Sequence, residues 1–304
     1  SKQVDFKHRK STKKQIVGVL LLFLIGLFTA PPQGKSQLSA SNNSSFLPVP
    51  LLEELKQGTH YGRPALILSN GMLELTVLEM GGALAKLILT DDPERTNPMW
   101  DGFRADREKG QPERPNGMVG HFTCVDGFGP VSDQEKAAGF PNIHGEAAWL
   151  PWATQSSVKK GNLVELSQAV YLPRVQELFT RTIRLVEGEK VIYVENKLAN
   201  LLDFDRPISW AEHATIGSPF LKPEVTVVDM SSNRAITRSK YAPSDNLQQR
   251  LLPNKEFTWP MAPTMSGTMV DLRSAPPTSN SSDWTAHLWN RDGELAFVTA
   301  LNLE

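Results

Sequence analysis

The stretch LILSNGMLELTVLEMGGALAKLIL, residues 66–89, decides the fold class. Every second residue from 73 to 77 is apolar, which is the period of a strand with one buried face. An Asn70-Gly71 pair before this run favours a tight turn, and Gly81-Gly82 separates it from a second apolar run. The stretch therefore predicts two strands joined through a glycine corner.

The same pattern returns later in the chain. Residues 179–195 (FTRTIRLVEGEKVIYVE) alternate around a turn at Gly188 and predict a hairpin, in which residues 179, 181, 183 and 185 share one face. Helical periodicity is confined to residues 51–57. Antiparallel strands separated by loops that contain Pro and Gly predict an all-β sandwich. The further strand candidates are residues 162–171, 225–230, 284–290 and 295–301.

Composition and motifs exclude several classes of protein. The chain has 304 residues, 40% of them hydrophobic, with 32 Lys and Arg against 33 Asp and Glu. Residues 1–40 hold seven of the basic residues and one of the acidic ones, which leaves 25 basic and 32 acidic residues in the body. An acidic body argues against a nucleic-acid partner, whose phosphates require a basic surface.

Two further observations concern cofactors. A single cysteine, Cys124, rules out an intrachain disulfide and disfavours a thiolate zinc site. The Gly127-Phe128-Gly129 segment is followed at once by Pro130, and there is no Walker-type loop, so nucleotide-binding folds are disfavoured. We expect neither a cofactor nor a metal.

The N-terminus has the layout of an export signal. Residues 7–14 (KHRKSTKK) are basic, and residues 16–30 (IVGVLLLFLIGLFTA) carry no charge. A signal peptide has an apolar region of about 7 to 15 residues, whereas a spanning helix needs about 20. We interpret residues 1–30 as a signal peptide or an uncleaved signal anchor. Either would export the body to the periplasm or the extracellular space, and an anchor would hold it to a membrane through residues 16–30.

The remaining chain divides into a linker and one domain. Residues 31–50 (PPQGKSQLSASNNSSFLPVP) are rich in Ser, Asn and Pro and too polar to pack, which predicts a disordered linker. We expect residues 51–304 to form a single β domain.

Two histidines lie in segments suited to binding a ligand. His144 belongs to residues 139–152 (GFPNIHGEAAWLPW), where Trp149 and Trp152 offer flat apolar faces on which the C–H groups of a sugar can stack. The alternative is a structural loop with buried tryptophans. His213 follows Glu212 in residues 208–221 (ISWAEHATIGSPFL). Histidine has the pKa that suits proton transfer at neutral pH, but a surface histidine beside a glutamate would have the same sequence.

Taken together, these segments resemble the aldose 1-epimerase, or galactose mutarotase-like, superfamily. The order and spacing agree over about residues 65 to 301, and the resemblance implies a β-supersandwich that binds a sugar in a cleft across one sheet. The matching pieces are residues 66–89 for the first hairpin, His144-Gly145 followed by Trp149 for the His-Gly segment, residues 179–200 for the middle hairpin, and Glu212-His213 followed by Gly217 for the catalytic-histidine segment.

The resemblance also implies a chemistry, the interconversion of sugar anomers by acid/base ring opening. It makes His213 the general acid near the ring oxygen and His144 the residue that orients the sugar. The family's base is a glutamate late in the chain, which we expect after Glu304, so the domain would continue beyond this sequence. The residues expected to bind the sugar are Trp149, Trp152, Glu212 and Asp126.

Two features depart from the family, and they leave other functions open. Ala148 stands where relatives carry arginine, and residues 120–131 (GHFTCVDGFGPV) lack the family's asparagine-arginine pair. A non-catalytic carbohydrate-binding protein with the same cleft is therefore an alternative. A cupin-like metal site would use His144, Glu146, Glu212 and His213, and a glycosidase would pair Asp126 with Asp133 or Glu135.

Overall fold

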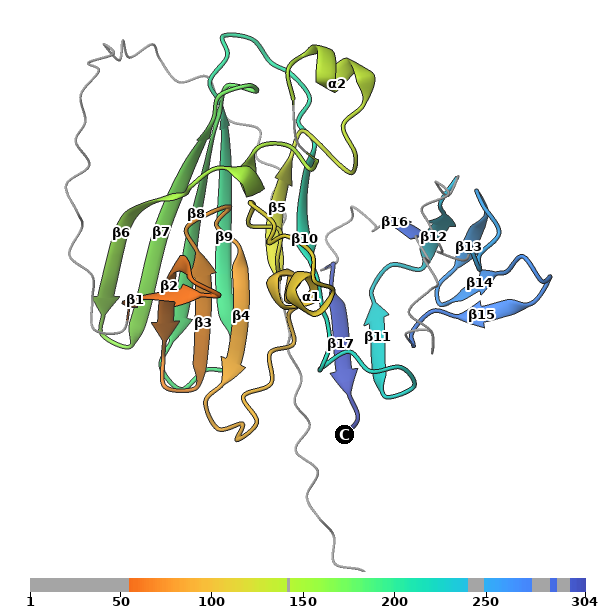
Figure 1. Ribbon diagram of the computed structural model, residues 1–304, viewed down its shortest axis with the longest axis horizontal. Coiled ribbons are helices and arrows are strands. Elements are labelled where there is room, and N and C mark those ends of the chain that lie inside the picture. The colour runs from red at the N-terminus through yellow and green to blue at the C-terminus, as the bar shows by residue number, and fades with distance from the viewer. Residues whose placement is uncertain (1–54, 141–142, 240–248, 275–284, 289–295) are drawn as a thin grey trace, which may run out of the picture.

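The computed structural model describes residues 55–140, 143–239, 249–274, 285–288 and 296–304 (Figure 1). The expected export signal and linker, residues 1–50, lie outside this part. Antiparallel strands dominate it, which confirms the all-β prediction. The helices are short: α1 (Gly102–Glu108), α2 (Asp133–Ala137) and a 3-10 turn at Ala147–Trp149. None of the helices in the described ranges is long and apolar enough to cross a bilayer.

The larger of the two main sheets has six strands. All of its neighbouring pairs are antiparallel. In spatial order the strands are β1 (Leu55–His60), β2 (Arg63–Ser69), β3 (Leu73–Leu78), β4 (Leu84–Leu89), β5 (His121–Val125) and β10 (Trp210–Ala214).

A four-stranded sheet faces the first one. It is a simple meander, because each strand pairs with the next in the chain. Its strands are β6 (Ala153–Lys160), β7 (Leu163–Leu172), β8 (Glu177–Val186) and β9 (Ile192–Asn200).

Three smaller sheets follow in sequence, and the pair β11–β17 lies nearest to β10 (Figure 1). The strands β11 (Thr226–Met230) and β17 (Val298–Asn302) form the first pair, and β14 (Met261–Pro263) and β15 (Met269–Asp271) form another. The third sheet has the order β13 (Glu256–Thr258), β12 (Arg234–Thr237) and β16 (Thr285–Leu288).

Most local predictions hold. The hairpin expected over residues 179–195 is β8–β9, and β7, β11, β16 and β17 overlap the other strand candidates as far as those are described. Residues 66–89 form parts of three strands, because a strand also precedes the Asn70-Gly71 turn. The helix expected over residues 51–57 is wrong from residue 55 onward, since β1 pairs there with β2 along its whole length.

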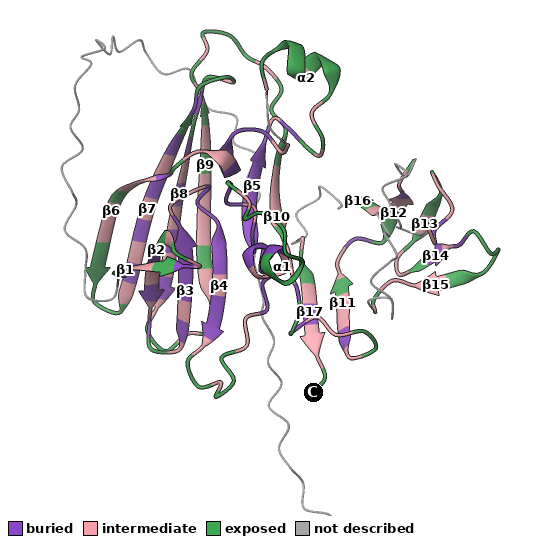
Figure 2. Cartoon of the chain, viewed as in Figure 1, coloured by how far each residue is buried: buried purple, intermediate pink, exposed green. Residues whose placement is uncertain are grey.

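The six-stranded sheet is buried on both faces along β2 to β5 (Figure 2). One cluster lies between the two main sheets and joins residues such as Leu66 and Leu75 to Leu166 and Ile183. A second cluster, which includes Ala65, Phe103, Phe122 and Cys124, covers the opposite face. We call these the inner and the outer face. Because side chains alternate along a strand, neighbouring residues belong to different layers of the molecule.

Candidate functional site

The structure brings His144 and His213 together on the outer face. Their ring centroids are 5.6 Å apart and their planes are nearly perpendicular, at 78°. Phe122 stacks on His213 with centroids 4.5 Å apart and meets His144 at 5.8 Å. Both imidazoles are half-buried, so each retains contact with solvent. The two predicted catalytic histidines therefore form one site with an apolar wall.

His213 owes its position to strand pairing. It lies on β10 directly opposite Phe122 of β5, and cross-strand neighbours of this kind have their side chains on the same face. Phe122 belongs to the outer cluster, so His213 points outward with it. Beyond the strand, the hydroxyl of Thr215 contacts His213 Nδ1 at 3.0 Å, which fixes the orientation of the ring.

His144 is held by a tight backbone crossing. Gly145 has φ of 74°, and a Cβ there would lie 2.1 Å from the carbonyl oxygen of Val125, so only glycine fits. His144 itself has φ of 65° and makes two contacts with Gly129: its amide donates to the Gly129 carbonyl at 3.3 Å, and its Nδ1 accepts from the Gly129 amide at 3.2 Å.

Trp149 stabilises the segment that carries His144. Its indole N–H donates to the carbonyl of Ile143 at 2.9 Å, and its ring packs against the outer cluster. The sequence predicted Trp149 as a sugar platform. The structure places it beside the His144 segment, half-buried, with its polar atom already engaged.

The surroundings of both rings favour the neutral form of the imidazole. Burial lowers the pKa of His144, with a further contribution from His213, and burial also lowers the pKa of His213. Because His144 Nδ1 accepts a hydrogen bond from a backbone amide, the neutral ring carries its proton on Nε2 and donates from there. His213 leaves its own Nε2 free of the Thr215 contact. The site thus combines one N–H donor with one nitrogen able to exchange a proton.

Glu212 belongs to a different layer of the molecule. It neighbours His213 in sequence, so it points to the inner face, where its carboxylate contacts His121 at 2.8 Å and Arg181 at 3.2 Å. It also accepts from Asn196 at 2.6 Å and from Trp210 at 3.0 Å. Burial raises its pKa, but Arg181 and His121 outweigh this and hold the pKa below its usual range. The prediction that Glu212 binds the sugar beside His213 is therefore corrected, since strand alternation separates the two.

Arg181 pairs with Glu212, and the sequence analysis did not identify it as part of this buried network. Arg181 is 0% exposed on β8 and donates to Asn196 at 2.9 Å, to the Gly82 carbonyl at 2.8 Å and to the Thr123 hydroxyl. Burial lowers its pKa and Glu212 opposes that change. The sequence does contain a signal for the burial of Arg181, because it shares one strand face with three apolar residues. A charged side chain on such a face is buried and needs a partner.

Trp152 is also part of the interior. It is 3% exposed, its indole N–H donates to the Ala147 carbonyl at 3.0 Å, and the Arg181 guanidinium lies 4.8 Å from its ring. Gly82 lies against its face so closely that a Cβ would come within 2.4 Å of the ring. The prediction that Trp152 stacks on a sugar is wrong, because both of its faces are covered by protein.

Asp126 is engaged in an ion pair near the end of β5. Its carboxylate contacts Arg206 at 2.5 Å and accepts from the Ser209 amide at 2.8 Å. Arg206 also contacts the buried Glu177, whose pKa is raised to about 7 by burial and by the charge of Asp126. Asp126 thus fixes the segment that leads into β10, and its carboxylate is engaged by Arg206 and by the Ser209 amide.

The sequence also left metal ligation and a glycosidase pair of carboxylates open. In the described part of the chain no group of three or more His, Cys, Asp or Glu side chains could hold a metal ion. Glu146 is turned away, accepting from the Arg174 amide at 3.0 Å. Of the carboxylates considered for a glycosidase, Glu135 closes the capping box of α2 with Ser132. Cys124 is buried, and burial raises the pKa of its thiol to about 12.

Comparisons with known proteins give structural likeness only. No family model matches the chain, and no curated protein does. A galactose mutarotase-like protein from Clostridium acetobutylicum is similar in structure, with a TM-score of 0.45 and 13% identity over 63% of this chain and 65% of its own. YeaD from Salmonella typhimurium, described as a candidate mutarotase, has a TM-score of 0.45 and 15% identity over 84% of this chain and 87% of its own. The chain thus spans about two thirds of the first of these proteins, and its own fold is an antiparallel all-β sandwich.

Proposed function

We propose that this chain binds a sugar at the His144–His213 pair and interconverts its anomers by opening and closing the ring. The observation that supports this most directly is the convergence of two neutral imidazoles, 5.6 Å apart, from segments that are distant in sequence. Neutral imidazoles are suited to moving protons between weakly acidic hydroxyls near neutral pH.

The geometry supports a route in which His213 moves a single proton. His213 Nε2 takes the proton from the anomeric hydroxyl, the bond between the anomeric carbon and the ring oxygen breaks, and the imidazolium returns the proton to the ring oxygen. The carbonyl turns, and the same steps in reverse close the ring on its other face. His144 Nε2–H donates a hydrogen bond to the oxygen on which negative charge develops. Atoms and protons balance, because His213 begins and ends neutral.

This assignment keeps the acid role predicted for His213 and adds the role of base. The lowered pKa of His213 is the reason, because a ring that is neutral at the start must accept a proton before it can donate one. Phe122 would exclude water from one side of the ring and hold it parallel to its own.

Polarimetry on freshly dissolved α-hexoses tests the proposal. We expect the native chain to shorten the relaxation to the anomeric equilibrium relative to buffer, and His213→Gln to remove the effect. His144→Gln should reduce it by about 10²-fold or more, the usual effect of losing a charge-stabilising donor. His287→Gln, which alters a half-buried histidine on β16, is the matched control. Relaxation that is equally fast with His213→Gln would overturn the proposal.

The second candidate function is sugar binding without catalysis. It is favoured by the pairing of Glu212 and Asp126 with arginines. Each of these carboxylates is already paired with an arginine, so neither is free to serve as the base in a route that requires one. Saturable shifts of sugar NMR signals, lost in His213→Gln but without faster relaxation, would establish this candidate instead.

A further inference from the structure

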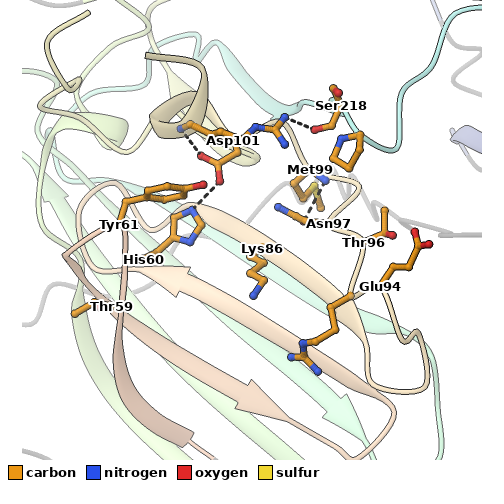
Figure 3. A pocket seen from close by; sticks show the side chains of 13 residues that line it. Thr59, His60, Tyr61, Lys86, Glu94, Thr96, Asn97, Met99, Asp101 and Ser218 are labelled. Atoms are coloured by element: carbon orange, nitrogen blue, oxygen red, sulfur yellow. Dashed lines mark hydrogen bonds and ion pairs between the residues drawn. The ribbon is translucent and has the colours of Figure 1, made fainter. Parts of the chain in front are cut away.

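A pocket of about 420 Å³ lies away from the two histidines, between the β1–β2 turn, β4, the segment before α1 and residues 218–219 (Figure 3). Neither His144 nor His213 lines it. The pocket wall is mixed: Tyr61, Met99 and Pro219 supply apolar surface, and Thr59 and Ser218 supply hydroxyls at its edge. A pocket of this size accommodates a molecule of a few to about a dozen heavy atoms.

Most charged groups of this pocket are already paired. Arg95 contacts Glu74 at 2.9 Å, and Arg104 contacts Glu108 at 3.5 Å and donates to the Ser218 carbonyl at 2.5 Å. Asp101 accepts from the Arg104 amide at 3.0 Å as the N-cap of α1.

Lys86 differs from them. It is half-buried on β4, and its ammonium group reaches the pocket without any ion pair in the described part of the chain (Figure 3). An ammonium group in a pocket without an ion-pair partner is available to an anion, and a hydrogen bond between two charged groups is stronger than one between neutral groups.

His60 adds a second polar group beside it. The residue is 9% exposed, and its Nε2 faces Asp101 at 3.5 Å (Figure 3). With Nε2 directed at the carboxylate, Nδ1 is the ring atom left for a ligand, and it makes no hydrogen bond with any described residue. A hydroxyl group of a ligand could donate to it.

We propose that this pocket binds a small hydroxylated monocarboxylate, with the carboxylate on Lys86 and a hydroxyl group on His60 Nδ1. A single negative charge matches the single unpaired cation. The exposed carboxylate of Glu94 at the rim disfavours a second negative charge, which argues against a phosphate dianion. The apolar wall suits the C–H face of a polyol chain.

D-Gluconate is a suitable probe, because it has no anomeric centre and is not a substrate for ring opening. D-Sorbitol has the same carbon skeleton without the carboxylate, and inorganic phosphate supplies a dianion. Isothermal titration of the full chain should show saturable binding of gluconate. Sorbitol should bind at least about tenfold more weakly, the usual effect of losing a charged hydrogen bond, and phosphate should bind more weakly than gluconate because Glu94 repels its second negative charge.

Variants locate the site and separate it from the histidine pair. Lys86→Met removes the charge but keeps an unbranched side chain that is one heavy atom shorter, and it should weaken gluconate binding at least about tenfold. Lys56→Met, at an exposed position of β1 outside the pocket, should leave it unchanged. His213→Gln should also leave it unchanged, so failure of the proposed epimerase would not affect this result.

Three outcomes would overturn the proposal: no saturable binding of gluconate by the native chain, binding that survives Lys86→Met, or sorbitol binding as tightly as gluconate. Phosphate binding more tightly than gluconate would replace the monocarboxylate with a dianion and contradict the charge argument. Circular dichroism of Lys86→Met confirms that any loss of binding is not a loss of folding.

Discussion

At the scale of single residues, the two neutral histidines link function to pH. Burial holds the pKa of His144 and of His213 below about 6.5, the value expected in an unfolded chain. As the pH falls below about 6.5, the unfolded chain takes up protons before the folded one does. The stabilisation from these groups is therefore complete above about pH 6.5 and is lost as the pH falls through the folded values.

The lowered pKa values of His144 and His213 predict how the stability of the protein changes with pH. The free energy of unfolding of the native chain should decline between about pH 6.5 and pH 5, and the double variant His144→Gln/His213→Gln should show a shallower decline. Urea unfolding at a series of pH values measures both slopes. His287, whose pKa burial also lowers, is present in both proteins and contributes equally. Equal slopes in the two proteins would show that the histidines are not kept neutral by burial.

The buried ion pair predicts a larger effect at a single residue. Glu212→Gln leaves the charge of the fully buried Arg181 without its partner, and breaking a buried pair typically costs about 3 to 5 kcal/mol. Glu195→Gln removes a partner of the half-exposed Arg184 and should cost about 0 to 1 kcal/mol. Chemical denaturation compares the two variants. Similar losses would mean that Arg181 is not charged or is solvated in the folded state.

At the scale of secondary-structure elements, the crossing of the His144 segment over β5 fixes the geometry of the site. Gly145→Ala would force a Cβ against the Val125 carbonyl and also demand a left-handed residue with a side chain. We expect a loss of roughly 2 to 5 kcal/mol in stability.

Gly71→Ala is the matched control for this prediction. Gly71 has φ of 83° but nothing within 4 Å of its Cβ position, so only the backbone cost of about 1 to 2 kcal/mol applies. Thermal unfolding of both variants measures the difference. If Gly145→Ala were no worse than Gly71→Ala, the close crossing would not exist in solution.

The element scale also shows what the sequence could reveal. Alternation along residues 179–185 puts Arg181 on an apolar face, so its burial follows from the strand pattern alone. The same rule applied to Glu212 and His213 would have separated them, because adjacent residues of one strand point to opposite faces. Alternation alone does not say which of the two residues points to the inner face. That depends on the pairing of β10 with β5, which is far away in sequence.

At the scale of the whole molecule, the His144–His213 pair lies on the outer face of the six-stranded sheet, which is covered by protein on both faces. The strands β2 to β5 pack against the four-stranded sheet on one side and against α1 and the His144 segment on the other. The inner face holds the Arg181–Glu212 pair, and the outer face holds the histidines. The sequence predicted the strands and the turns, because these are local patterns. The covering elements came from long-range packing that local patterns do not encode.

The most direct test of the account is NMR exchange spectroscopy of a hexose at anomeric equilibrium, with the full chain and its His213→Gln variant, from pH 5 to pH 8. We predict that the native chain speeds α-to-β exchange above the rate in buffer and that the variant shows the buffer rate. The gain should fall as acid protonates His213, at pH values below those at which a free imidazole titrates, because burial lowers the pKa of His213. Exchange at the buffer rate with the native chain, or equally fast exchange with His213→Gln, would contradict the proposal that this histidine pair opens the sugar ring.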